Sequence, residues 1–119
     1  MKTDIKILMS DDSAFMRKVL KDILQGAGFT NFIEASNGKE AIEKYRAEKP
    51  DLILLDVVMP ELDGVGVTKE IGKEATIIMV SAVGQDSVIK EATDNGAKGY
   101  IVKPFDKTKV LEMIEKVIG

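Results

Sequence analysis

Five polar residues in this sequence carry side chains that could do chemistry together, and each closely follows a short apolar run. They are Asp11, Asp12, Asp56, Ser81 and Lys103. Carboxylates serve as phosphoryl-accepting nucleophiles in proteins, and as hard oxygen ligands they favour Mg²⁺. A lysine supplies a point positive charge and a serine a hydroxyl donor for the oxygens of a phosphoryl group. If the five side chains converge, they predict a metal site beside a phosphorylated aspartate.

Each of these residues also has an ordinary structural interpretation. Either aspartate of the 11–12 pair could cap a helix, Ser81 could form a turn, and Lys103 could be a solvated charge. For any one residue alone, the structural interpretation is the more frequent. The occurrence of all five at the ends of successive strands favours the functional interpretation.

Alternating strands and helices are predicted to position these side chains. Apolar runs with strand character cover 5–10, 32–35, 52–55, 76–80 and 99–102. Helical periodicity begins at Ala14, after the Asn37-Gly38 turn, at Val65, at Ser87 and after the candidate N-cap Asp106. The helix over 65–73 is the weakest, because it contains two glycines. This pattern predicts one domain over 1–119, a three-layer α/β sandwich with a five-stranded parallel sheet and five helices.

Parallel strands bring their carboxyl ends to one edge of a sheet, and ligand chemistry lies just beyond that edge. The run over 52–55 is apolar throughout and is expected to present Asp56 to solvent at this edge. Three ionised carboxylates cannot lie close together without a counter-charge. Convergence of the aspartates therefore calls for a cation.

The composition excludes several classes of function. The chain has 17 basic and 20 acidic residues with no run of like charge, so it lacks the electrostatic footprint of a nucleic-acid-binding protein. It has no cysteine and no histidine, which excludes disulfides, thiolate nucleophiles, imidazole bases and typical zinc clusters. No apolar run approaches the roughly 18 residues of a membrane span. We expect a soluble, cytoplasmic, monomeric protein without membrane insertion.

Four motifs closely resemble those of response-regulator receiver domains: DDSAFMRK (11–18), DVVMPELDG (56–64), SA (81–82) and GYIVKPF (99–105). The resemblance covers essentially the whole chain and is greatest to stand-alone chemotaxis regulators, although the chemotaxis methylesterase has a similar N-terminal receiver. It implies a flavodoxin-like strand order 2-1-3-4-5 and a phosphoacceptor response regulator of a two-component system. The implied partners are a CheA-like histidine kinase, a chemotaxis output or motor-switch protein, and an external phosphatase.

The resemblance also implies a role for each residue of the site. Asp56 is expected to accept phosphate, Asp12 to bind Mg²⁺ directly, and Asp11 to assist through metal-bound water. Mn²⁺ is expected to substitute for Mg²⁺. The main-chain carbonyl of Val58 would complete the protein ligands, and Lys103 would contact the phosphoryl group. The regulator is not expected to be an enzyme in the ordinary sense, although it assists its own phosphorylation and dephosphorylation.

Other positions match the switch of the family. Phosphorylation is expected to draw Ser81 inward and to let Tyr100 rotate into the space that Ser81 vacates. Ala82 matches a position that is kept small beside the site. The output surface is expected on the last two helices and the strand between them, around Lys90, Lys98, Tyr100 and Met113.

The lifetime of the phosphorylated state depends on the approach of water. Val58 and Val83 are expected to flank that approach, and valine replaces an asparagine that the enteric chemotaxis regulator has at position 58. The family also implies a cis peptide bond between Lys103 and Pro104. The connection over 73–75 is a few residues shorter than is usual in the family.

Three other functions are consistent with parts of the pattern. A single-domain phosphorelay shuttle would use the same site. A flavin-binding module would need a Ser/Thr/Gly loop after the first strand, where this chain has two aspartates. A Mg²⁺-dependent phosphatase of the haloacid dehalogenase type would place its nucleophile after the first strand in a DxD arrangement, whereas the pair here is contiguous.

Overall fold

The computed structural model describes residues 2–119. Strands and helices alternate along this part of the chain: β1 (Lys6–Ser10), α1 (Ala14–Gly26), β2 (Asn31–Ala35), α2 (Gly38–Glu48), β3 (Leu52–Leu55), α3 (Gly64–Ile71), β4 (Ile77–Ser81), α4 (Asp86–Asp94), β5 (Gly99–Val102) and α5 (Lys107–Ile118). All four strand pairings are parallel, in the order β2-β1-β3-β4-β5. The predicted fold and strand order are confirmed.

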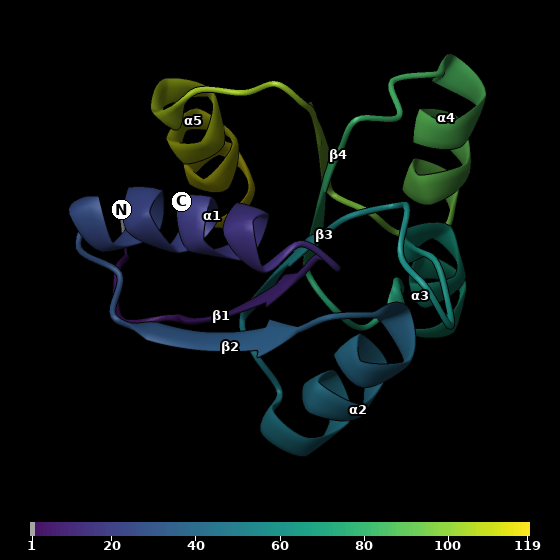
Figure 1. Cartoon of the computed structure of the whole chain (residues 1–119), viewed down its shortest axis with the longest axis horizontal. Helices are drawn as coiled ribbons and strands as arrows, with labels where there is room; N and C mark the ends of the chain where they lie inside the picture. The colour runs from purple at the N-terminus through teal and green to yellow at the C-terminus, as the bar shows by residue number, and fades with distance from the viewer. Residues whose placement is uncertain (1) are drawn as a thin grey trace.

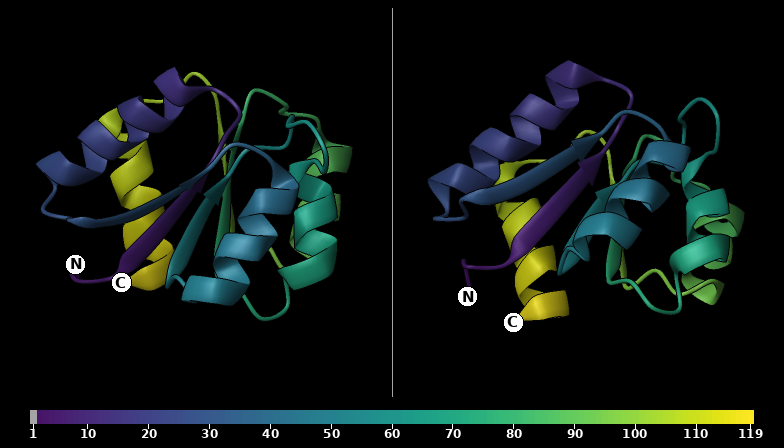
Figure 2. Two further views of the ribbon diagram at one scale, coloured as in Figure 1. Left: turned by 60° about the horizontal axis from the view of Figure 1, so that its bottom comes forward. Right: turned by 90° about the horizontal axis from the view of Figure 1, so that it is seen from below.

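The sheet separates two apolar cores. Figures 1 and 2 show the helix layers that cover its two faces. Helices α1 and α5 cover one face, where Leu20, Leu24, Val110 and Ile114 pack on the sheet. Helices α2, α3 and α4 cover the other face with a second cluster of buried side chains. The β3 side chains are all buried, which agrees with a parallel strand covered on both faces. Within residues 2–119, no helix is both long and apolar enough to cross a membrane.

Helix α3 ends at Ile71, two residues before the predicted end. Its terminus passes so close to the loop after α4 that a Cβ on Gly72 would lie 2.0 Å from the carbonyl oxygen of Asn95. Gly72 is therefore a packing requirement at the C-cap rather than a weak interior position. The start of the helix is capped by Asp63, whose side chain accepts a hydrogen bond from the Gly66 amide at 2.8 Å.

The connection from β3 to α3 is held directly behind the acidic site. The Gly64 amide donates to the Val57 carbonyl at 2.8 Å. A Cβ on Gly64 would lie 2.1 Å from the carbonyl oxygen of Asp56, so only glycine permits this close approach. The loop that follows Asp56 is thereby tied back onto the end of its own strand.

Candidate functional site

The three predicted aspartates meet at the carboxyl edge of the sheet. One carboxylate oxygen from each of Asp11, Asp12 and Asp56 lies within 4.8 Å of the other two. The sheet hydrogen bonding continues just past the strands, where the Asp56 amide donates to Ser10 at 2.9 Å and the Asp11 amide donates to Ala35 at 3.1 Å. These backbone bonds hold the end of β3 beside the end of β1, and the β1–α1 loop beside the end of β2. The predicted convergence is confirmed.

Lys103 is the counter-charge of this cluster and is not a solvated lysine. Its Nζ lies 2.9 Å from Asp11 Oδ2 and 3.3 Å from Asp56 Oδ2, and its side chain is 17% exposed. Burial by itself lowers the pKa of the ammonium group. The hydrogen bond to Asp11 and the charges of both carboxylates outweigh burial, and the pKa of Lys103 is raised. The Lys103–Pro104 peptide bond is cis, as expected.

Asp56 is buried, so the expectation that its strand presents it to solvent was wrong. The residue is 7% exposed. Its Oδ1 accepts a hydrogen bond from the Val57 amide at 2.7 Å and a longer one from the Val58 amide at 3.4 Å. Its Oδ2 faces Lys103. Local amides and one ammonium group therefore stabilise the charge that burial would otherwise disfavour.

The helix cap that the sequence allowed for Asp11 or Asp12 belongs instead to Ser13. The Ser13 hydroxyl accepts from the Met16 amide at 3.1 Å and caps α1. Asp11 is 3% exposed, and its Oδ1 accepts from the Ser13 amide at 2.9 Å. Asp12 is exposed. Neither aspartate is used as an N-cap, and both remain available to the site.

Ser81 and Tyr100 both form hydrogen bonds with Val83 in the loop after β4, and within residues 2–119 neither is hydrogen-bonded to the three aspartates. Ser81 is fully buried as the last residue of β4, and its Oγ accepts from the Val83 amide at 3.2 Å, so it is also the turn former that the sequence allowed. The Tyr100 hydroxyl donates to the Val83 carbonyl. Burial raises the pKa of Tyr100, and the charge of Asp56 adds to this, while a hydrogen bond with Ser81 opposes it. The charge of the Asp56 carboxylate therefore acts on the Tyr100 hydroxyl.

The residues predicted to border the site lie mostly at the surface. Val58 is 61% exposed, Ala82 is exposed, and Val83 is half-buried. Phe15, at the start of α1, is 74% exposed.

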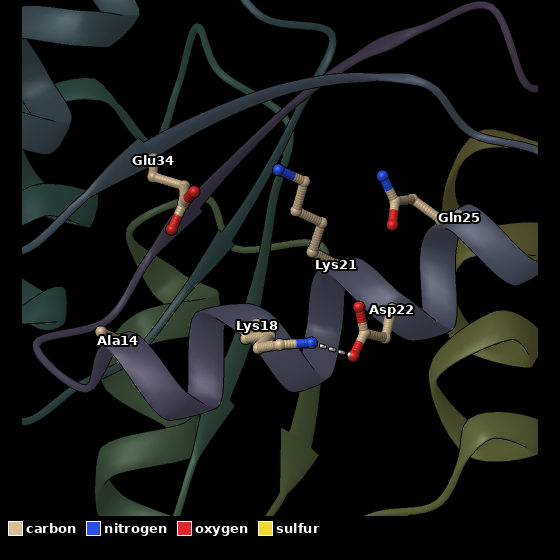
Figure 3. Close-up of a pocket in the computed structure, with 6 residues that line it drawn as sticks. All are labelled: Ala14, Lys18, Lys21, Asp22, Gln25 and Glu34. Atoms are coloured by element: carbon tan, nitrogen blue, oxygen red, sulfur yellow. Dashed lines mark hydrogen bonds and ion pairs between the residues drawn. The ribbon is translucent and has the colours of Figure 1, made fainter.

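A hollow of about 410 Å³ lies away from the predicted site, between α1 and β2. Figure 3 shows its lining, with Glu34 on the strand, Lys21 extending from the helix toward the strand, and Lys18 directed along the helix to Asp22. Its walls are Ala14, Lys18, Lys21, Asp22, Gln25 and Glu34. Charges of both signs line it and include the Lys18–Asp22 ion pair at 2.9 Å. The hollow contains none of the five residues predicted to do chemistry.

Arg17 was also missed, and it lies against the acidic loop. Its Nη1 donates to the main-chain carbonyl oxygen of Asp11 at 2.5 Å, and its Nε donates to Glu34 Oε1 at 2.8 Å. No sequence pattern could have identified these contacts, because both partners lie outside the helix that carries the arginine.

Comparison with known proteins agrees with this geometry. A model of the response regulator receiver domain matches residues 7–115. The chemotaxis protein CheY of Bacillus subtilis is 49% identical over 117 residues, covering 96% of this chain and 98% of that protein. CheY of Thermotoga maritima is 48% identical over 115 residues, covering 94% and 96%.

A similar solved structure is a crystal structure of a CheX–CheY–BeF₃–Mg²⁺ complex from Borrelia burgdorferi. The matching chain has a TM-score of 0.91 and 37% sequence identity, and the match covers 97% of this chain and 90% of that one. Strand order, acidic cluster, partly buried lysine and sequence similarity lead to one conclusion: this chain belongs to the family of response regulator receiver domains.

Proposed function

We propose that this receiver domain is a cytoplasmic chemotaxis regulator that accepts a phosphoryl group on Asp56 from a CheA-like histidine kinase, with Mg²⁺. Membership of the family makes it a phosphoacceptor response regulator. The observation that carries the assignment of the site is the bridge from Lys103 to Asp11 and Asp56 within a cluster of three carboxylates. The chemotaxis role is supported by the relatives named CheY.

The residues present fit a divalent cation. Three carboxylates offer oxygens within 4.8 Å of one another, and one ammonium group cannot neutralise all of them. Hard oxygen donors of this kind suit Mg²⁺, and Mn²⁺ as a substitute. Asp11, Asp12, Asp56 and the main-chain carbonyl of Val58 would hold the ion. When bound, it neutralises negative charge on the phosphoryl oxygens.

The chain's own residues account for the phosphoryl transfer. A carboxylate oxygen of Asp56 attacks phosphorus, a new O–P bond forms, and the bond from phosphorus to the donor breaks. The Val57 amide holds Oδ1, and Lys103 stabilises the incoming phosphoryl charge. The Ser81 hydroxyl accepts a hydrogen bond from the Val83 amide and forms another with Tyr100, so an inward shift of Ser81 would redirect its proton from the tyrosine to a phosphoryl oxygen.

Ser81 and Tyr100 would transmit the phosphorylation of Asp56 to a partner-binding surface. We place that surface on α4, β5 and α5, because Tyr100 on β5 responds to the charge of Asp56 and bonds the loop before α4. A chemotaxis output protein would bind there, around Lys90, Lys98, Tyr100 and Met113. An external phosphatase would end the signal. The comparisons do not favour a phosphorelay shuttle or a haloacid-dehalogenase-type phosphatase.

The test is mass spectrometry of the intact chain after incubation with acetyl phosphate and Mg²⁺. We expect one phosphoryl group on the parent and on Asp86→Asn, a matched control at an exposed aspartate on α4. We expect none on Asp56→Asn, and none on the parent in excess chelator. An adduct that survives Asp56→Asn, or one that forms equally well in chelator, contradicts the proposal.

A further inference from the structure

One arginine anchors the acidic loop through its main chain rather than through a carboxylate. Arg17 Nη1 donates to the carbonyl oxygen of Asp11 at 2.5 Å, while Nε donates to Glu34 Oε1 on β2 at 2.8 Å. The Arg17 side chain is only 16% exposed. Because the guanidinium group is planar, two directional bonds at different nitrogens determine its orientation. Glu34 therefore aims the arginine at the loop.

The anchored carbonyl belongs to the peptide unit between the two acidic residues. A peptide unit is planar, so holding the carbonyl of Asp11 also holds the amide of Asp12. The other groups of Asp11 already have partners: its amide donates to Ala35, and its carboxylate accepts from the Ser13 amide and from Lys103. The guanidinium group completes this set. Asp11 is thus held by its backbone and its side chain together.

Asp12 lacks comparable support of its own. It is exposed, and the structure of residues 2–119 records no hydrogen bond or ion pair to its carboxylate. The direction of that carboxylate depends on the backbone at 11–12. A group that fixes this backbone therefore influences where the carboxylate lies relative to Asp56.

We propose that Arg17, oriented by Glu34, is a positioning residue that holds the carboxylate of Asp12 where it binds Mg²⁺. This inference rests on the proposed function, because Mg²⁺ is the ligand that the carboxylate serves. The charge of Arg17 alone would have the opposite effect. A cation near the cluster disfavours a second cation, so removing the charge by itself would tighten Mg²⁺ binding. Positioning predicts weaker binding, and the sign of the change separates the two explanations.

The experiment measures the dissociation constant of Mg²⁺ alone on the full chain, by amide NMR titration at constant ionic strength. Arg17→Gln is compared with Lys18→Gln, which makes the same charge change at the neighbouring residue. Lys18 has a side chain that is 72% exposed and pairs only with Asp22 in residues 2–119. We expect the constant to rise roughly tenfold in Arg17→Gln, the lower end for loss of a residue that supports a metal ligand. We expect Lys18→Gln to stay within about twofold of the parent.

Two further variants keep the test decisive if Arg17→Gln folds poorly. Arg17→Lys keeps the charge but cannot donate in two fixed directions, so a rise in its dissociation constant reports positioning alone. Glu34→Gln leaves Arg17 in place but removes an anion, and this loss by itself weakens cation binding, so the informative result of this variant is an unchanged or lower constant, which overturns the proposal. Each is expected to raise the constant roughly 2- to 13-fold, the effect of one hydrogen bond. Thermal unfolding in chelator reports stability separately, and a purely structural role would lower the melting temperature without moving the constant.

Each outcome decides between the two proposals. A parent that binds no Mg²⁺ overturns the proposed function and this inference together. A parent that binds Mg²⁺, with Arg17→Gln, Arg17→Lys and Glu34→Gln at its value or tighter, overturns this inference and leaves the proposed function intact. Weaker binding in both Arg17 variants, with Lys18→Gln unchanged, supports the positioning role.

Discussion

Asp12→Asn should stabilise the metal-free protein even though it removes a proposed metal ligand. The Asp12 carboxylate lies within 4.8 Å of those of Asp11 and Asp56. At that separation two unit charges interact by about 0.9 kcal/mol in bulk water and about 3.5 kcal/mol at an effective dielectric constant of 20. Because Asp12 is exposed, the water value applies. Asp12 forms no ion pair with Lys103 in residues 2–119, so the lost attraction to the ammonium group offsets only part of the two repulsions, and the net gain is about 1 kcal/mol.

This gain corresponds to a rise in melting temperature of roughly 3–6 °C for a chain of this size. The assay is thermal unfolding followed by circular dichroism, first in chelator and then with Mg²⁺. With Mg²⁺ at 100 times its dissociation constant, the parent gains about 2.7 kcal/mol by mass action. Asp12→Asn should gain much less, so the parent should have the higher melting temperature in Mg²⁺ and the lower one in chelator.

The control is Asp4→Asn, a change of the same charge at an exposed aspartate outside the cluster. It should leave both melting temperatures nearly unchanged. If Asp12→Asn melts at or below the parent in chelator, repulsion among the three carboxylates is not what limits the stability of the metal-free state. If the parent does not have the higher melting temperature in Mg²⁺, Asp12 is not a ligand of the metal ion.

Three further predictions concern the switch, the phosphorylated state and the fold. The chain has 2 tyrosines, so Tyr100 can be observed alone in a Tyr45→Phe background. In this background, Asp56→Asn should lower the pKa of Tyr100, because it removes the carboxylate charge. The pKa is measured from phenolate absorbance, and an equal or higher value would falsify the electrostatic coupling of Asp56 to Tyr100. Since the pKa of Tyr100 is raised on folding, its contribution to stability is present below the pKa of an unfolded tyrosine, about 10, and is lost as the pH rises through the folded value. Val58→Asn should speed phosphate release roughly 2- to 13-fold, because an amide can orient the attacking water with one hydrogen bond and valine cannot; decay no faster than that of the parent rules this out. Gly72→Ala should destabilise the protein by about 1–3 kcal/mol in urea unfolding, because its Cβ would lie 2.0 Å from a carbonyl oxygen; unchanged stability would mean that the loop after α4 yields freely.

The sequence alone determined the architecture and the edge where the site lies. Apolar runs separated by stretches of helical period permit few arrangements other than a parallel sheet covered on both faces. Parallel connectivity then brings Asp11, Asp12, Asp56 and Lys103 to the same edge, whatever the exact strand ends. For this reason these four side chains lie together despite one-residue shifts in β4 and a shorter α3.

The tertiary structure alone decided which atoms pair. Lys103 reaches Asp11 across 92 positions of sequence, and Arg17 reaches the carbonyl of that residue from the next helix. The burial of Asp56 and the requirement for glycine at 72 likewise depend on neighbouring loops. Local sequence patterns indicate the hydrophobic period, the secondary-structure propensity and the average burial of a segment. The contacts named above depend instead on how separate helices, strands and loops pack against one another. A shift of about 1 Å between elements makes or breaks such a hydrogen bond, and no local pattern in the chain encodes it.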